Sequence, residues 1–145
     1  LGEEQLRAAA DSFIAAIKSD AIKKVLSKPE AQVSVVNEQP FAVRVEKGTC
    51  FAEVTLKEHT DLQGFIDRLV VYYDNIGKPK RAEVIDWKTD SIESIDSAEG
   101  KSKIQHYAPQ LASYRFAVSK LFGIPAGEIA TFLVFVHTKE IVEVP

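Results

Sequence analysis

Several residue types are scarce in this chain of 145 residues, and each scarcity excludes a class of protein. Cys50 is the only cysteine, so the chain alone can build neither a disulfide framework nor a cysteine-ligated zinc or iron–sulfur centre. This usage fits a reducing cytosol, and we expect a cytoplasmic protein. The longest apolar stretch, residues 129–136, is far shorter than the roughly 20 residues that span a bilayer, so we expect no membrane partner.

An excess of positive charge is also missing, because the formal net charge is −3. This value argues against a protein that binds nucleic acid through overall basic charge alone. A content of 46% hydrophobic and 27% charged residues is typical of one folded domain. Methionine is absent, and the chain begins in what reads as the middle of a helix. We therefore expect a single domain over residues 1–145, cut from a longer protein that supplies an upstream helix.

The first third of the chain predicts two helices followed by β-structure. Apolar residues recur at helical spacing in the first segment: Leu6, Phe13, Ile14 and Ile17. Ser19 is a helix cap for a short second helix, which we expect to end before Pro29. Apolar residues then alternate with polar ones between residues 33 and 56, which predicts short antiparallel strands broken by turns at 37–40 and 47–48.

The remaining segments predict a hairpin, a helix and a last pair of strands. Residues 62–73 and 81–87 are the most strongly apolar strands, and the turn-forming cluster 74–79 between them predicts an antiparallel hairpin. Residues 89–103 are polar and predict an exposed loop. Pro109 then stands near the start of a helix that Gly123 caps. A buried strand over 129–136 and an edge strand over 140–144 follow, so we expect an α+β fold.

The candidate chemistry lies on the predicted hairpin. Side chains alternate faces along a strand, so Asp86 and Lys88 point the same way at the end of an apolar strand. Asp67 is the lone acid of the partner strand, and a turn near residues 75–80 would set it opposite Asp86. Two carboxylates that meet in this way suit Mg²⁺, which prefers oxygen ligands. Lys88 beside the metal could orient or deprotonate an attacking water.

A structural explanation competes with this one at each position. A carboxylate and a lysine two residues apart on a strand are common, and they often form an ordinary ion pair. Asp67 could equally be the salt-bridge partner of Lys88 or of Arg68. The functional interpretation depends on the coincidence of several motifs.

Those motifs resemble the RecB/AddA-type nuclease domains of the PD-(D/E)XK superfamily. The family patterns G-x-x-D, D-[YW]-K-T and Q-x-x-x-Y are matched by residues 64–67, 86–89 and 110–114 in that order. Residues 38–41, Glu-Gln-Pro-Phe, are similar to the family's E-x-P-F turn. The resemblance covers residues 33–136. It implies an α/β/α restriction-endonuclease-like fold, with a central mixed, mainly antiparallel sheet flanked by helices.

The resemblance also implies roles for individual residues. Asp67, Asp86 and the backbone carbonyl of Trp87 would bind Mg²⁺, or Mn²⁺ in its place, and Lys88 would be catalytic. Further residues within or beside the motifs are expected to support the active site or contact DNA: Gln110, Tyr114, Arg68, Thr89 and Glu38. Simple core packing is an equally open explanation for Tyr114, which stands in the apolar stripe of its helix.

The family's histidine ligand has no counterpart here at the expected place. None of the three histidines, His59, His106 and His137, lies in the opening helices, so we expect the ligand upstream of Leu1. The resemblance implies a Mg²⁺-dependent exonuclease that acts on DNA, as single-stranded ends, in DNA end processing and recombinational repair. Helicase domains in the parent chain and a partner subunit would be its partners.

Two other functions stay open at this stage. The chain could be a catalytically weak or inactive nuclease-like scaffold that binds DNA in a larger complex. It could also be an unrelated small-molecule-binding α+β domain, in which case the matching motifs are accidental.

Overall fold

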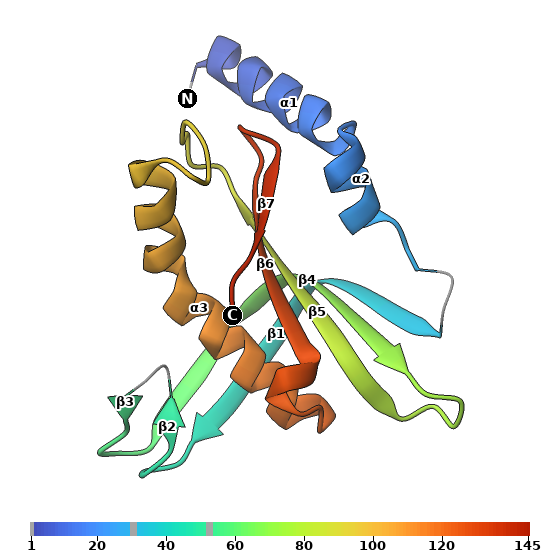
Figure 1. Cartoon of the computed structure of the whole chain (residues 1–145), viewed down its shortest axis with the longest axis vertical. Helices are drawn as coiled ribbons and strands as arrows, with labels where there is room; N and C mark the ends of the chain where they lie inside the picture. Colours follow the sequence, from blue (N-terminus) through green and yellow to red (C-terminus); the bar gives the residue numbers. More distant parts are fainter. Residues whose placement is uncertain (1, 30–31, 52–53) are drawn as a thin grey trace.

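The computed structural model describes residues 2–29, 32–51 and 54–145 and shows one five-stranded sheet with helices on both faces (Figure 1). The strand order is β1-β4-β5-β6-β7. The strands of this sheet are β1 (Val33–Val45), β4 (Thr60–Tyr73), β5 (Pro79–Lys88), β6 (Ile129–Phe135) and β7 (Glu140–Glu143). Only the β5–β6 pair is parallel within it. The sheet is therefore mixed and mainly antiparallel, which confirms the predicted restriction-endonuclease-like α+β fold.

Smaller elements complete the chain. The helices are α1 (Glu3–Ile17), α2 (Asp20–Leu26), α3 (Ala98–Phe122) and the 3-10 turn η1 (Ala126–Glu128), and a separate two-stranded ribbon consists of β2 (Cys50–Phe51) and β3 (Val54–Thr55). The predicted strand near residues 51–56 includes positions 52–53, which lie outside the described residues. Both predicted N-terminal helices are confirmed, and the backbone N–H of Ile22 donates to Ser19 Oγ, as expected of a cap.

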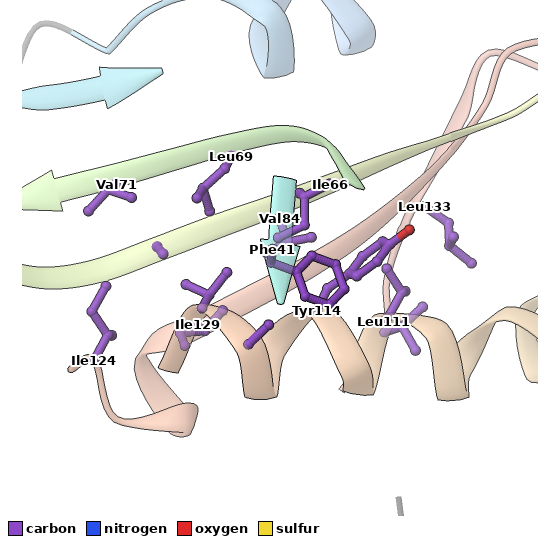
Figure 2. Packing of buried hydrophobic residues seen from close by; sticks show 14 of the residues in the cluster. Phe41, Ile66, Leu69, Val71, Val84, Leu111, Tyr114, Ile124, Ile129 and Leu133 are labelled. Atoms are coloured by element: carbon purple, nitrogen blue, oxygen red, sulfur yellow. The ribbon is translucent and has the colours of Figure 1, made fainter. Parts of the chain in front are cut away.

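The alternation of side chains along β4 and β5 divides the core into two layers. Leu69, Val71 and Val84 pack toward α3, where Leu111 and Tyr114 are also buried (Figure 2). The intervening residues face the other way and pack against the buried α1 and α2 residues: Val70, Tyr72 and Ile85 against Ala16 and Ile22. Each layer removes apolar side chains from water, and together they hold β4 and β5 rigidly between the helices.

The predicted hairpin of β4 and β5 is confirmed. Its turn is stabilised by Asp74, whose Oδ1 accepts hydrogen bonds from the backbone N–H groups of Ile76 at 3.0 Å and Lys78 at 2.8 Å. Gly77 in this turn has a φ of 80°, a conformation that glycine adopts without a steric penalty. The turn therefore sets the register that aligns the two strands.

The predicted break at residues 37–40 is wrong, because β1 runs through it as one strand. Asn37 pairs with Arg68 and Gln39 with Ile66, so the register with β4 is unchanged across the segment. Only Glu38 leaves the extended conformation, with a φ of 55°. Strand β1 tolerates proline at position 40 because it lies at the edge of the sheet. In the described part of the chain, no further strand lies on its solvent side, so a missing N–H there costs no interstrand hydrogen bond.

The predicted boundary before α3 is also wrong. The helix begins at Ala98 inside the expected loop, and Pro109 lies in its interior rather than in its first turn. Ser97 is the cap, since its Oγ accepts a hydrogen bond from the N–H of Gly100 at 3.0 Å. The other end is as predicted, with Gly123 in the left-handed conformation at a φ of 67°.

The outer side of α1 carries exposed apolar residues. Leu6 is 54%, Phe13 49% and Ile14 44% exposed, so the apolar face predicted for this helix is only partly covered. Within the part of the chain that the structure describes, no helix is both long and apolar enough to cross a membrane.

Candidate active site

The register of the β4–β5 hairpin brings the two predicted acids together. Strand pairing reaches Arg68 opposite Ile85, and one further step of the same register places Asp67 opposite Asp86. Beyond this point a side chain takes the place of the backbone acceptor on β4, because the backbone N–H of Trp87 donates to Asp67 Oδ2 at 2.8 Å. The prediction that the hairpin sets the two carboxylates opposite each other is therefore consistent with the strand register.

Asp86 is a buried carboxylate with one charged partner. It is 2% exposed, and its Oδ2 lies 2.6 Å from Nζ of Lys88. Burial raises the pKa of Asp86 above its ordinary value, the charge of Asp67 adds to this, and Lys88 opposes both. Oδ2 accepts no well-aligned hydrogen bond among the described residues. An oxygen buried in this way is suited to bind a cation.

The backbone of β5 directs a third oxygen toward the same place. In a strand, the N–H and C=O of one residue point to the same side, and the next residue points to the other. The N–H of Trp87 points to β4, since it bonds Asp67 there. The carbonyl of Lys88 points to β6, since it accepts from the N–H of Val136 at 3.0 Å. The carbonyl of Trp87 is therefore directed toward the β4 side, with the carboxylate of Asp67.

These oxygens fit a hard divalent cation. Mg²⁺ binds proteins through one or two carboxylates and keeps several waters, which matches a site with Asp67, Asp86 and a backbone carbonyl. No cluster of three or more His, Cys, Asp or Glu side chains with metal-binding geometry occurs among the described residues. By their chemistry the three oxygen donors fit a hard divalent cation, and water would fill the remaining coordination positions.

Helix α3 covers the site and holds Lys88. Nζ of Lys88 donates a 2.8 Å hydrogen bond to Oε1 of Gln110, and Nε2 of Gln110 donates a 2.8 Å bond to the hydroxyl of Tyr114. Tyr114 is 7% exposed, and its ring meets that of Phe41 edge-on at 5.6 Å. Burial, followed by the charges of Asp86 and Asp67, raises the pKa of Tyr114 to about 12. Tyr114 therefore combines core packing with a hydrogen bond to Gln110, and its role in the active site stays a prediction.

A second set of contacts at the site was not predicted from the sequence. Nζ of Lys88 lies 3.8 Å from the centroid of the Tyr107 ring. The hydroxyl of Tyr107 donates to Oδ2 of Asp90 at 2.7 Å, and Nζ of Lys103 lies 2.7 Å from Oδ1 of the same carboxylate. Tyr107 precedes Gln110 by three residues, so helical spacing was the signal that could have placed it on the same face.

Arg68 lies on the opposite face of the sheet from Asp86. Its Nη2 donates to the carbonyl of Leu26 at 2.7 Å and its Nη1 to Oδ1 of Asn37 at 3.3 Å. The side chain is 7% exposed, and burial lowers its pKa from the ordinary value for arginine. These contacts attach α2 to the sheet. A role for Arg68 in DNA binding stays a prediction, and its observed contacts are structural.

Two other predicted residues lie on the side of α1. Thr89 follows β5, is exposed, and lines a pocket that also includes Phe13 and His137. Glu38 is exposed and lines, with Asp67, a groove of about 490 Å³ whose apolar wall includes Phe13, Ile17, Leu26 and Trp87. Asp67 is partly exposed, and this groove borders it.

Among the described residues, none of the three histidines joins Asp67 and Asp86 in a metal-binding cluster. Nδ1 of His59 lies 2.6 Å from Oε2 of Glu46, beyond the far end of β1. His106 is exposed on α3, and His137 is exposed in the turn after β6. The expectation of a histidine ligand outside this sequence stays a prediction.

Comparison with known proteins agrees with this geometry. An ATP-dependent helicase/nuclease subunit of Listeria innocua serovar 6a is 30% identical over 125 residues, which cover 83% of this chain and 9% of that protein. This chain thus spans about a tenth of the length of this curated relative. A family model of the PD-(D/E)XK nuclease superfamily matches residues 2–144. With nearly its whole length matched, the chain belongs to the PD-(D/E)XK nuclease superfamily.

Proposed function

We propose that this chain hydrolyses phosphodiester bonds of DNA with the help of a divalent cation, Mg²⁺ or Mn²⁺. The observation that carries the proposal is the convergence of Asp67, Asp86 and Lys88 at the end of the β4–β5 hairpin, with the carboxylate of Asp86 buried and its Oδ2 2.6 Å from the ammonium of Lys88. A buried carboxylate costs desolvation energy unless a cation or a hydrogen bond compensates it. Binding a divalent ion would relieve that cost.

Each residue would have a distinct part in the reaction. Asp67, Asp86 and the carbonyl of Trp87 would hold the cation, which when bound would polarise the phosphate and lower the pKa of a water. Lys88, as an ammonium, would donate hydrogen bonds to the attacking water or to a phosphate oxygen. Gln110 would fix the direction of that ammonium through its 2.8 Å bond. The groove beside Asp67 would let the substrate strand approach.

The biological setting is proposed from the likeness to a helicase/nuclease protein. Within such a protein, the domain would act as an exonuclease on DNA ends, in end processing and recombinational repair, and a helicase would deliver single strands to it. A partner subunit would contribute further contacts. The net charge of −3 fits this arrangement, because the chain then need not supply the basic channel for DNA.

A DNA cleavage assay tests this proposal, with active-site variants and control variants that all lie on strand β5. Single-stranded DNA labelled at either end is incubated with the protein in EDTA, Mg²⁺ or Mn²⁺. We expect Asp86→Asn and Lys88→Met to lower metal-dependent cleavage by about 100-fold or more. The controls Glu83→Gln and Lys80→Met remove the same kinds of group from β5 away from the site, and we expect them to stay within about twofold of wild type.

Two results would contradict the proposal. The first is metal-dependent cleavage that survives in both active-site variants, which would place the chemistry elsewhere. The second is DNA binding by the wild type without cleavage at any metal concentration, which is what an inactive nuclease-like scaffold would give. The label that is released first, from the 5′ or the 3′ end, would assign the polarity.

A further inference from the structure

We propose that Tyr107 is a positioning residue for Lys88, and this inference rests on the proposed nuclease function. The ammonium of Lys88 lies 3.8 Å from the centre of the Tyr107 ring, within the range in which an aromatic face attracts a cation. Asp86 and Gln110 contact the same ammonium at 2.6 and 2.8 Å. The ring therefore forms a wall of the cage that surrounds the Lys88 nitrogen.

Tyr107 is itself held in place by an ion pair at the edge of the site. Its hydroxyl donates to Oδ2 of Asp90 at 2.7 Å, and Lys103 binds the other oxygen of that carboxylate at 2.7 Å. Hydrogen bonds from Lys103 and Tyr107 keep the pKa of Asp90 below its ordinary value, with Lys103 the larger cause. Asp90 follows β5 closely, so these bonds also attach the end of the catalytic strand to α3.

The contacts around the Lys88 nitrogen matter because a lysine side chain is long and loses conformational entropy when it is fixed in one position. Asp86 alone is a poor anchor, since the proposed function gives its carboxylate a second task in binding the cation. Gln110 and Tyr107 are uncharged and come from adjacent turns of α3. They can hold the ammonium of Lys88 without competing with a divalent ion for Asp86.

Two substitutions of Tyr107 separate positioning from simple packing. Tyr107→Leu removes the aromatic face, and we expect kcat to fall about tenfold, equivalent to about 1.4 kcal/mol, with KM changed less than about twofold. Tyr107→Phe keeps the face and loses only the hydroxyl, so we expect kcat within about threefold of wild type. If Tyr107 acted only through the hydrogen bond of its hydroxyl, Tyr107→Phe would lower kcat as much as Tyr107→Leu.

Tyr72 provides a matched control at the other end of the hairpin. Its ring carries Arg81 at 3.9 Å from the centroid, and its hydroxyl donates to Glu83 at 3.0 Å, so it makes the same two kinds of contact as Tyr107. We expect Tyr72→Leu to lower the unfolding temperature but to leave kcat within about twofold. An equal loss of kcat in Tyr72→Leu and Tyr107→Leu would overturn the proposal.

A spectroscopic measurement tests the placement of Lys88 independently of activity. Protons that lie over an aromatic ring resonate upfield, so the ¹Hε–¹³Cε signal of Lys88, assigned with Lys88→Met, should be shifted upfield of the other lysine signals. We expect Tyr107→Leu to abolish this shift and Tyr107→Phe to retain it. An unshifted Lys88 signal in the wild type would overturn the proposal. A shifted signal in a protein that shows no metal-dependent cleavage would instead refute the proposed function and leave the contact standing.

Discussion

Replacing Lys88 by methionine tests the electrostatics of the buried site through stability. Methionine keeps much of the apolar stem but removes the ammonium that lies 2.6 Å from Asp86, a carboxylate that is only 2% exposed. Breaking a buried pair by removing one partner costs about 3–5 kcal/mol, because an uncompensated charge remains. Since some exposure remains at Lys88, we expect a loss near 3 kcal/mol at pH 8 without metal.

The sign of the pH dependence follows from the pKa of Asp86. That pKa is already raised by burial, and Lys88 lowers it, so removing Lys88 raises it further from the ordinary value of 3.8. A carboxyl group with a raised pKa in the folded state loses stability as pH rises through that pKa. The cost of Lys88→Met should therefore be small at a pH below that raised pKa, where Asp86 is protonated, and should increase as the pH rises through it toward pH 8.

Urea unfolding in EDTA, followed by the fluorescence of the single tryptophan, Trp87, measures this cost. The double variant Asp86→Asn with Lys88→Met removes both charges, and we expect it to lie within about 1 kcal/mol of wild type at pH 8. A loss in Lys88→Met that is the same at pH 5 and pH 8, or a double variant as unstable as the single one, would refute the reasoning.

Three further variants test other parts of the structure. Arg68→Met should destabilise the fold by about 2 kcal/mol in urea unfolding, because the carbonyl at the end of α2 loses its partner, but should leave the kcat for cleavage unchanged. Gly100→Ala should lower stability by about 2–3 kcal/mol in the same assay, since its Cβ would overlap the carbonyl oxygen of Ser94. Tyr114→Phe removes the acceptor of the 2.8 Å bond from Gln110, and we expect about 1 kcal/mol of stability to be lost by calorimetry.

The parts of the fold that follow from local patterns could be predicted from the sequence. The alternation along β4 and β5, with a turn centred on Asp74 and Gly77, was enough to predict the hairpin and to suggest that Asp67 would face Asp86. Helix α3 ends at Gly123 as expected, because glycine adopts the left-handed conformation required there at the lowest steric cost. These features depend on residues close together in sequence.

The two wrong predictions have different physical causes. Pro109 suggested the start of a helix, yet it stands in the middle of α3, where it removes one N–H, and its own carbonyl accepts a 3.0 Å hydrogen bond from Ser113. Pro40 suggested a turn, yet pairing with β4 continues through it because β1 lies at the sheet edge. The pairing of β1 with β4 is a long-range contact that the residues beside Pro40 do not encode, whereas the Ser97 cap that starts α3 is a local signal.

The site was predictable only in part for a similar reason. Strand alternation placed Asp86 and Lys88 on one face, but it could not show that α3 brings Tyr107 and Gln110 onto Lys88. Arg68 shows the reverse case, since the same alternation turns it away from Asp86. Membership of a motif did not by itself indicate the face on which a side chain lies.

The most direct test of the metal site is a crystal of this protein soaked with Mn²⁺ and measured for anomalous scattering. We expect a peak between the carboxylates of Asp67 and Asp86, in contact with the carbonyl of Trp87, at Mn–O distances of about 2.2 Å. Crystals of Asp86→Asn should lack that peak. An anomalous peak found only at other carboxylates, with density between Asp67 and Asp86 absent at saturating Mn²⁺, would contradict the central claim.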